Sequence, residues 1–105
     1  MVSIQDFQKL DLKVGEILSV KDIPAADKLY LLEVNVGKKI QLVAGIKQFY
    51  TPKELVKKKI IVITNLEPAK IRGFESQGML LAAEQNGKIV LLAPDKDIEP
   101  GSKIR

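Results

Sequence analysis

With 105 residues, 46% of them hydrophobic and 29% charged, and a net charge of +4, the chain has the make-up of one soluble globular domain spanning residues 1–105. It contains no cysteine and no histidine, which excludes disulfides, Cys/His metal sites, thiolate nucleophiles and imidazole acid–base chemistry. No stretch is apolar enough to span a bilayer and the N-terminus has no signal-peptide pattern, so we expect a cytoplasmic protein without membrane contact.

The N-terminal part predicts a helical turn and then a long strand. Ser3 and Asp6 have the spacing of a capped helix N-terminus. Between Leu12 and Val20, apolar side chains recur with the alternating period of a strand, and Gly15-Glu16 interrupts them where a bulge could bend it. We therefore expect a helical turn that covers one end of the core, followed by a coiled first strand.

Two further strands and a short helix come next. A break at Ile23–Asp27 precedes alternating apolar residues over Tyr30–Val36, and a turn at Gly37 leads to a third strand over Ile40–Ala44. In the segment Thr51–Leu55, threonine can cap a helix, proline suits the first helical position and glutamate completes a capping box. A short helix is therefore expected after the third strand.

The last third predicts two more strands, a polar loop and a hairpin. Ile60–Ile63 is apolar on both faces, as in a strand buried on both sides. Residues 65–78 read as a polar loop punctuated by Gly and Pro, after which Gly78–Ala83 resumes the sheet. Asn86-Gly87 is the strongest hairpin signal in the chain and joins that strand to residues 88–92.

This order of elements predicts an all-β fold. The expected form is a five-stranded OB-fold barrel with a short helix between strands 3 and 4, an N-terminal helical turn and a C-terminal extension over about residues 94–105. An SH3-like barrel is the alternative, but that fold gives no reason for a helix at this point. The position of the helix therefore favours the OB-fold.

Positive charge is concentrated in the middle of the chain. Residues 38–72 have a net charge of +7, whereas residues 1–37 carry −2 and residues 73–105 carry −1. Such a surplus is typical of polyanion binders, although a lysine-rich surface also keeps a protein soluble. The run Lys57–Lys59, with Lys47 and Lys53, is interpreted mainly as a solvated face that adds long-range attraction.

The loop from Asn65 to Met79 is the best candidate for a contact surface. It gathers donors able to contact phosphate and ribose: Asn65, Lys70, Arg72, Ser76 and Gln77. The arginine supplies a planar fork suited to phosphate. The alternative is that the polar side chains only close turns and that the two cations are solvated. Neither a G-x-G-x-x-G nor a Gly-Lys-Ser/Thr element occurs, and Gly73 and Gly78 are interpreted as turn and bulge positions.

Few aromatic side chains are available for stacking on bases. The chain has only Phe7, Tyr30, Phe49, Tyr50 and Phe74. Tyr30 fits the inward side of its strand, while the phenylalanines at 49 and 74 and Tyr50 are candidates for stacking or a subunit contact. This shortage favours recognition of a folded RNA through its backbone and 2′-hydroxyls. The carboxylates show no spacing that places two in a cleft, so no catalytic group is predicted.

Several motifs in one order span nearly the whole chain: Asp6–Gly15, Ala26–Tyr30, Tyr50–Leu55, and Asn65–Gly73 running into Ser76–Ala83. Together they resemble the tRNA-binding domain found at the C-terminus of many methionyl-tRNA synthetases, in free-standing tRNA-binding proteins and in cofactors of multi-synthetase complexes. The chain is compatible both with a free-standing protein and with a synthetase domain.

The resemblance implies an OB-fold that docks on the outer corner of the tRNA L-shape, with little dependence on nucleotide sequence. It implies support of methionyl-tRNA synthetase in cis or in trans during protein biosynthesis. From the residues themselves, no catalysis by the domain and no cofactor or metal is expected. The resemblance also implies a homodimer, whose interface would use residues 94–105 and the N-terminal helix.

The matching motifs imply a set of tRNA-binding residues: Lys28, Asn65, Lys70, Arg72, Ser76 and Met79. Lys13 is a weaker candidate, since the family often has arginine there and lysine lacks its bidentate geometry. Met79 could equally belong to the core. A related export-associated family is similar in sequence, so a protein-interaction or chaperone-like homodimer of the same fold is the alternative function.

Overall fold

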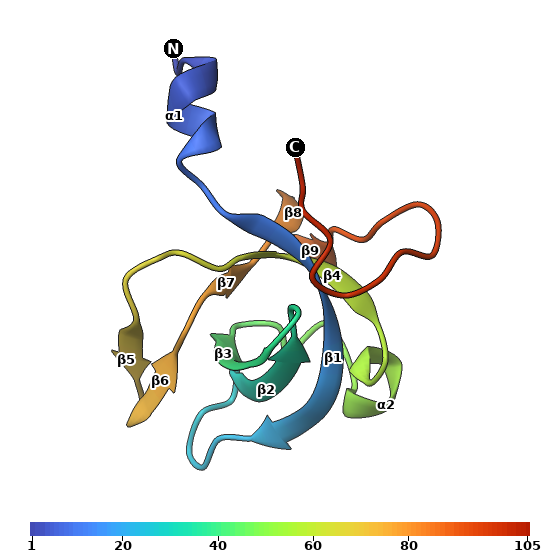
Figure 1. Ribbon diagram of the computed structural model, residues 1–105. Helices are drawn as coiled ribbons and strands as arrows, with labels where there is room; N and C mark the ends of the chain where they lie inside the picture. The colour runs from blue at the N-terminus through green and yellow to red at the C-terminus, as the bar shows by residue number, and fades with distance from the viewer.

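One long strand, β1 (Leu12–Asp22), organises the fold in the computed structural model, which describes residues 1–105 (Figure 1). It pairs antiparallel with β4 (Lys59–Ile63) along its first half and with β2 (Tyr30–Asn35) along its second half. Outside these, β3 (Lys39–Ala44) pairs with β2, and β7 (Met79–Leu80) pairs with β4. The resulting order β3-β2-β1-β4-β7 is the five-stranded barrel predicted from the sequence.

The bend of β1 has a different origin from the one predicted. The pairing with β2 shifts between Ile17 and Ser19, so the extra residue is Leu18 and not Gly15-Glu16. Leu18 turns outward and is 43% exposed, which leaves Ile17 fully buried in the core. Gly15 serves close packing instead, because a Cβ there would lie 2.7 Å from a methyl of Val34.

The core is filled from the barrel strands and from α2 (Pro52–Leu55). As predicted, α2 begins at a capping box in which the Thr51 hydroxyl accepts from the Glu54 amide and the Glu54 carboxylate accepts from the Thr51 amide. Its Leu55 is fully buried. Tyr30 is 4% exposed and is a core residue.

Two segments project beyond the barrel. α1 (Ile4–Gln8) is the predicted capped helical turn, and its cap is a capping box of Ser3 and Asp6. None of its residues is buried, so the expectation that it covers the core is wrong. It stands away from the barrel in Figure 1. β8 (Ala82–Gln85) and β9 (Lys88–Leu91) form the hairpin predicted at Asn86-Gly87, yet they make a separate sheet because the strand expected from Gly78 divides after β7.

The segment predicted as a loop between residues 65 and 78 contains a second small hairpin. β5 (Ala69–Ile71) and β6 (Phe74–Ser76) pair through a two-residue turn, Arg72-Gly73, in which both residues have positive φ. This is the backbone geometry that suits a tight hairpin. In Figure 1 the β5–β6 hairpin extends from one side of the barrel, and α2 lies on the other.

The C-terminal extension is attached to the barrel. The Val14 amide donates to the Ser102 carbonyl, and the amides of Gly101 and Ile104 donate to the carbonyls of Val14 and Leu12. The extension therefore pairs with the first residues of β1, which β2 does not reach.

The two helices have five and four residues, and neither is long or apolar enough to cross a bilayer.

Candidate nucleic-acid interface

The β5–β6 hairpin presents two cations to solvent. Lys70 lies on β5 and Arg72 occupies the first turn position with φ of 53°, and both are exposed. Lys70 is opposite Glu75 in the register of the hairpin. Arg72 therefore lies at the tip of the hairpin, in a backbone conformation that suits a tight turn.

A third predicted residue lies beside this tip. Lys28 belongs to the loop between β1 and β2, whose backbone is fixed by the buried side chains of Ile23 and Ala26 and by the Lys47 amide, which donates to the Lys28 carbonyl. Together with Arg72, the loop lines a hollow of about 360 Å³: Ala25, Ala26, Asp27, Lys28 and Leu29. Residues more than forty positions apart in the printed sequence thus share one concave surface.

Ser76 has a different environment from the one expected of an RNA contact. It is 6% exposed, and its hydroxyl accepts from the Val43 amide at 3.1 Å and donates to the Gly78 carbonyl at 3.0 Å. Its hydrogen-bonding capacity is therefore used inside the protein. The geometry gives Ser76 a structural role at the root of the β5–β6 hairpin.

Gln41 and Gln77, together with Ser76, form the seam that joins β3 to the β5–β6 hairpin. The Gln77 amide donates to the Gln41 carbonyl, the Gln41 amide donates to Gln77 Oε1, and Gln41 Nε2 donates to the Glu75 carbonyl, at distances of 2.8 to 2.9 Å. Side-chain groups here replace part of a regular strand ladder. No sequence pattern indicated this role of Gln41, since the alternation of its strand predicts only that its side chain faces outward.

Asn65 is also engaged within the chain, although its side chain is exposed. Its Oδ1 accepts from the Asp11 amide at 2.8 Å, and its Nδ2 donates to the Lys9 carbonyl at 2.7 Å. Thr64 adds a hydroxyl bond to the Asp11 carbonyl. These contacts fix the connection between α1 and β1 to the end of β4.

The remaining two predicted residues lie apart from the hollow. Lys13 is half-buried on β1, 3.8 Å from an Asp11 carboxylate oxygen, and its backbone bridges to Lys103. Met79 on β7 is 50% exposed, so it is not a core residue. The structure therefore brings Lys28, Lys70 and Arg72 to one side and leaves these two outside that group.

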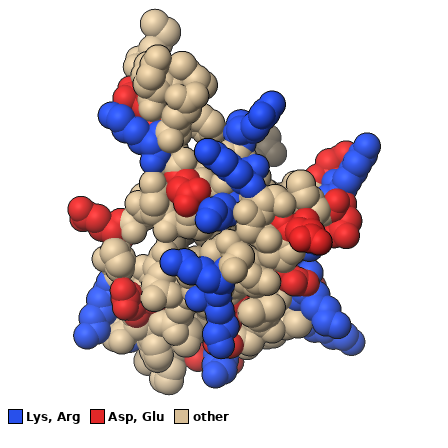
Figure 2. All heavy atoms as spheres, in the orientation of Figure 1, with Lys and Arg blue, Asp and Glu red and all other residues tan.

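The positive charge of residues 38–72 does not form one patch. The β5–β6 hairpin and the lysines that follow α2 lie on different sides of the barrel (Figure 1). On the face drawn in Figure 2, Lys and Arg side chains project at many points and are interspersed with Asp and Glu. The basic side chains on this face therefore do not merge into one continuous positive surface.

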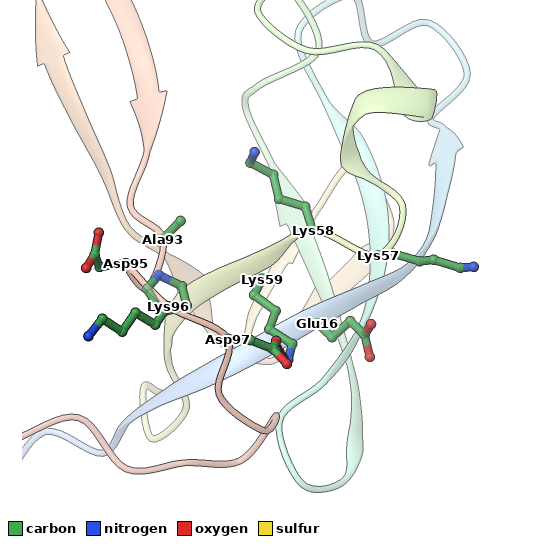
Figure 3. A pocket seen from close by; sticks show the side chains of 9 residues that line it. Glu16, Lys57, Lys58, Lys59, Ala93, Asp95, Lys96 and Asp97 are labelled. Atoms are coloured by element: carbon green, nitrogen blue, oxygen red, sulfur yellow. Dashed lines mark hydrogen bonds and ion pairs between the residues drawn. The ribbon is translucent and has the colours of Figure 1, made fainter.

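The lysines after α2 border a second hollow, of about 490 Å³, with the start of the C-terminal extension. Lys59 Nζ donates to Asp97 Oδ1 and to the Ile98 carbonyl, and the bond to Lys59 lowers the pKa of Asp97. Lys57 and Lys58 point away from one another in Figure 3. Of these lysines, Lys59 is the one that contacts the extension, and the group does not converge on one point.

The tyrosines are structural as well. The Tyr30 hydroxyl donates to the Tyr50 carbonyl at 2.8 Å, and the Tyr50 hydroxyl accepts from the Leu91 amide at 3.1 Å. Phe49 is 39% exposed and is the most exposed aromatic residue of the chain.

No group of three or more Asp or Glu side chains is arranged to hold a metal ion.

Comparison with known proteins shows which family the chain is similar to. Residues 12–103 match the family model described as "Putative tRNA binding domain". The chain is 54% identical over 105 residues to the methionine–tRNA ligase of Pyrococcus horikoshii; the match covers 99% of this chain and 14% of the ligase.

Two solved structures have the same fold over the whole chain. The MetRS related protein of P. horikoshii superimposes with a TM-score of 0.94 at 34% identity, covering 100% of this chain and 98% of that one. The CsaA chaperone protein of Picrophilus torridus gives a TM-score of 0.92 at 37% identity, with both chains fully covered. With its barrel, its hairpin and nearly all its residues matched, the chain belongs to the tRNA-binding domain family.

Proposed function

We propose that this chain is a non-catalytic module that binds the outer corner of the tRNA L-shape and supports methionyl-tRNA synthetase. The observation that carries the proposal is the convergence of Lys28 and Arg72 on one hollow, beside Lys70 on the β5–β6 hairpin. Cations grouped on one side of the barrel suit the phosphates of a folded RNA, whose positions are set by its shape.

The mechanism is electrostatic. Each phosphate neutralised by a lysine or arginine releases counterions, so affinity falls as salt rises. Asn65 and Ser76 have their side-chain groups engaged inside the protein, which leaves Lys and Arg as the main donors on this side. Such a surface contacts the RNA backbone and depends little on nucleotide sequence.

The synthetase is the proposed partner, joined in cis or in trans. This is supported by the similarity to the P. horikoshii ligase, of which the chain matches only 14%. The reaction of the whole enzyme would be carried out by other parts, and the site of action would be the cytoplasm.

The proposed module is a homodimer. Apolar side chains of α1 are exposed, and Ile4, Phe7, Leu10 and Ile104 line a hollow of about 160 Å³ between α1 and the C-terminal extension. A second copy of the chain would cover this surface, since an exposed apolar helix face next to an apolar hollow favours association.

The test removes both cations of the hairpin. Lys70→Ala/Arg72→Ala should weaken tRNA binding and lower the slope of log affinity against log salt by about 1.8, so that raising salt from about 50 to 200 mM costs about tenfold less affinity than in the wild type. A gel-shift titration at two salt concentrations measures this, with particle mass recorded in parallel.

The matched control is Lys53→Ala/Lys96→Ala, which removes the same charge from exposed lysines near α2 and the C-terminal extension. We expect it to change affinity and slope much less. If both double variants behave alike, net charge alone drives binding. Equal affinity of the wild type for tRNA and for an unstructured RNA of the same length would contradict shape recognition.

The similarity to the CsaA chaperone protein of P. torridus favours a second function, in which the dimer holds polypeptide. Removing Lys70 and Arg72 separates the two. Loss of tRNA binding with the dimer intact supports the first function. Binding of an unfolded polypeptide by wild type and variant alike, together with no measurable binding of tRNA, supports the second.

A further inference from the structure

The hollow beside the β5–β6 hairpin contains an acidic residue that the proposed phosphate contacts do not use. Asp27 lines it together with Lys28 and Arg72. Its carboxylate is exposed and makes no hydrogen bond and no ion pair within the chain. A carboxylate repels phosphate, so its presence in the same hollow as two cations is unfavourable for a site that binds phosphate alone.

The loop that carries Asp27 has a fixed backbone. Ile23 and Ala26 anchor it in the core, and the Ala26 amide donates to the Ile23 carbonyl. Ala25 has φ of 60°, a left-handed conformation that costs an alanine energy and that the surrounding packing maintains. The backbone from which the Asp27 side chain projects is therefore anchored to the core.

The walls of the hollow match the parts of a nucleotide backbone. Lys28 and Arg72 supply positive charge for phosphate, and Ala25, Ala26 and Leu29 supply apolar surface for the carbons of a sugar. An ionised carboxylate only accepts hydrogen bonds. The group on the RNA backbone that donates one is the ribose 2′-hydroxyl, which DNA lacks.

We propose that this hollow is a ribose–phosphate subsite in which Asp27 accepts a hydrogen bond from a 2′-hydroxyl while Lys28 and Arg72 neutralise the adjoining phosphates. Asp27 is then a specificity residue that favours RNA over DNA. The inference rests on the proposed tRNA binding and adds to it a reason for the acidic residue of the site. Base amino groups are also donors, but every RNA nucleotide has a ribose, which suits recognition that depends little on sequence.

The experiment compares tRNA with a DNA of the same sequence, using the full chain at one salt concentration. The wild type should bind the RNA more tightly, and Asp27→Ala should reduce the ratio of the two dissociation constants by roughly tenfold, the effect of one hydrogen bond to a charged acceptor. DNA binding should become tighter, because a repulsive charge is removed. Asp27→Asn keeps an acceptor oxygen and should give an intermediate ratio.

The control is Glu75→Ala, which removes an exposed carboxylate opposite Lys70 on the same hairpin. It should strengthen binding of RNA and DNA by the same factor and leave the ratio unchanged. An unchanged ratio in Asp27→Ala, in a variant that unfolds at the wild-type temperature and still binds tRNA, overturns this inference alone. If the wild type binds neither polymer, the proposed function fails and this inference fails with it.

Discussion

Replacement of Ser76 by alanine separates a structural role from an RNA contact. Its hydroxyl accepts from the Val43 amide and donates to the Gly78 carbonyl, and the residue is 6% exposed. Alanine at this position leaves both backbone groups without partners in a region from which water is largely excluded. A lone unsatisfied buried group costs about 1–3 kcal/mol.

The expected loss in the free energy of unfolding is therefore about 2 kcal/mol, since Val43 is only half-buried and part of the penalty is relieved by solvent. For a domain of this size such a loss lowers the melting temperature by roughly 10 °C. The number of phosphates contacted does not change, so the salt slope of tRNA binding should stay at its wild-type value.

Urea unfolding followed by circular dichroism measures the first quantity, and tRNA titration at several salt concentrations measures the second. Ser19→Ala is the control, because the Ser19 hydroxyl bonds only to the partly exposed Glu33 side chain; a loss of at most about 1 kcal/mol is expected there. The reasoning is refuted if Ser76→Ala unfolds like the wild type but binds tRNA about tenfold more weakly with a reduced salt slope.

Two further predictions concern packing and pH. Gly15→Ala should lower the free energy of unfolding by about 2–3 kcal/mol, because its Cβ would lie 2.7 Å from a methyl of Val34 in the core. Gly73→Ala is the comparison, since a Cβ there meets no atom within 4 Å but the backbone φ is +86°, and it should cost about 1 kcal/mol. Equal losses in the two variants would contradict the packing argument. The bond from Lys59 keeps the pKa of Asp97 below the pKa of the same group in the unfolded chain. The stabilisation of the folded state by this bond is therefore present at neutral pH and is lost as the pH falls through the folded pKa. Between about pH 5 and 3, the melting temperature of Asp97→Asn should therefore fall less than that of the wild type; parallel curves would show that this bond contributes nothing.

Much of the barrel was predictable because local signals agree with the tertiary arrangement. The capped turn at Ser3 and the capping box at Thr51 appear where their spacing predicted them. The hairpin at Asn86-Gly87 forms with the positive φ values that this pair favours. The β5–β6 hairpin was missed because its three-residue strands are too short to show an apolar alternation. The bulge was misplaced because a glycine in a strand signals either a bulge or close packing.

The candidate site was predictable only as a list of residue types. Asn65, Ser76 and Arg72 all look like donors in the sequence, yet the first two bond to backbone groups of Asp11 and Val43, and these partners lie far away along the chain. The same holds for the hollow, since no local pattern places the loop of Asp27 beside the Arg72 turn. Contacts that depend on barrel closure cannot be inferred from spacing alone.

The seam made by Gln41, Gln77 and Ser76 has a consequence for the energetics of binding. Side chains of these three residues make most of the bonds that close the barrel there. We therefore expect this edge to open at a lower free energy than the β1–β2 and β1–β4 edges, which are closed by strand pairing. The hairpin with Lys70 and Arg72 is attached to that edge, and an open seam would displace both cations. A bound polyanion that requires the closed form would then stabilise the seam by mass action, in proportion to its concentration above the dissociation constant. Closure of the barrel and occupancy of its surface would thus be one linked equilibrium.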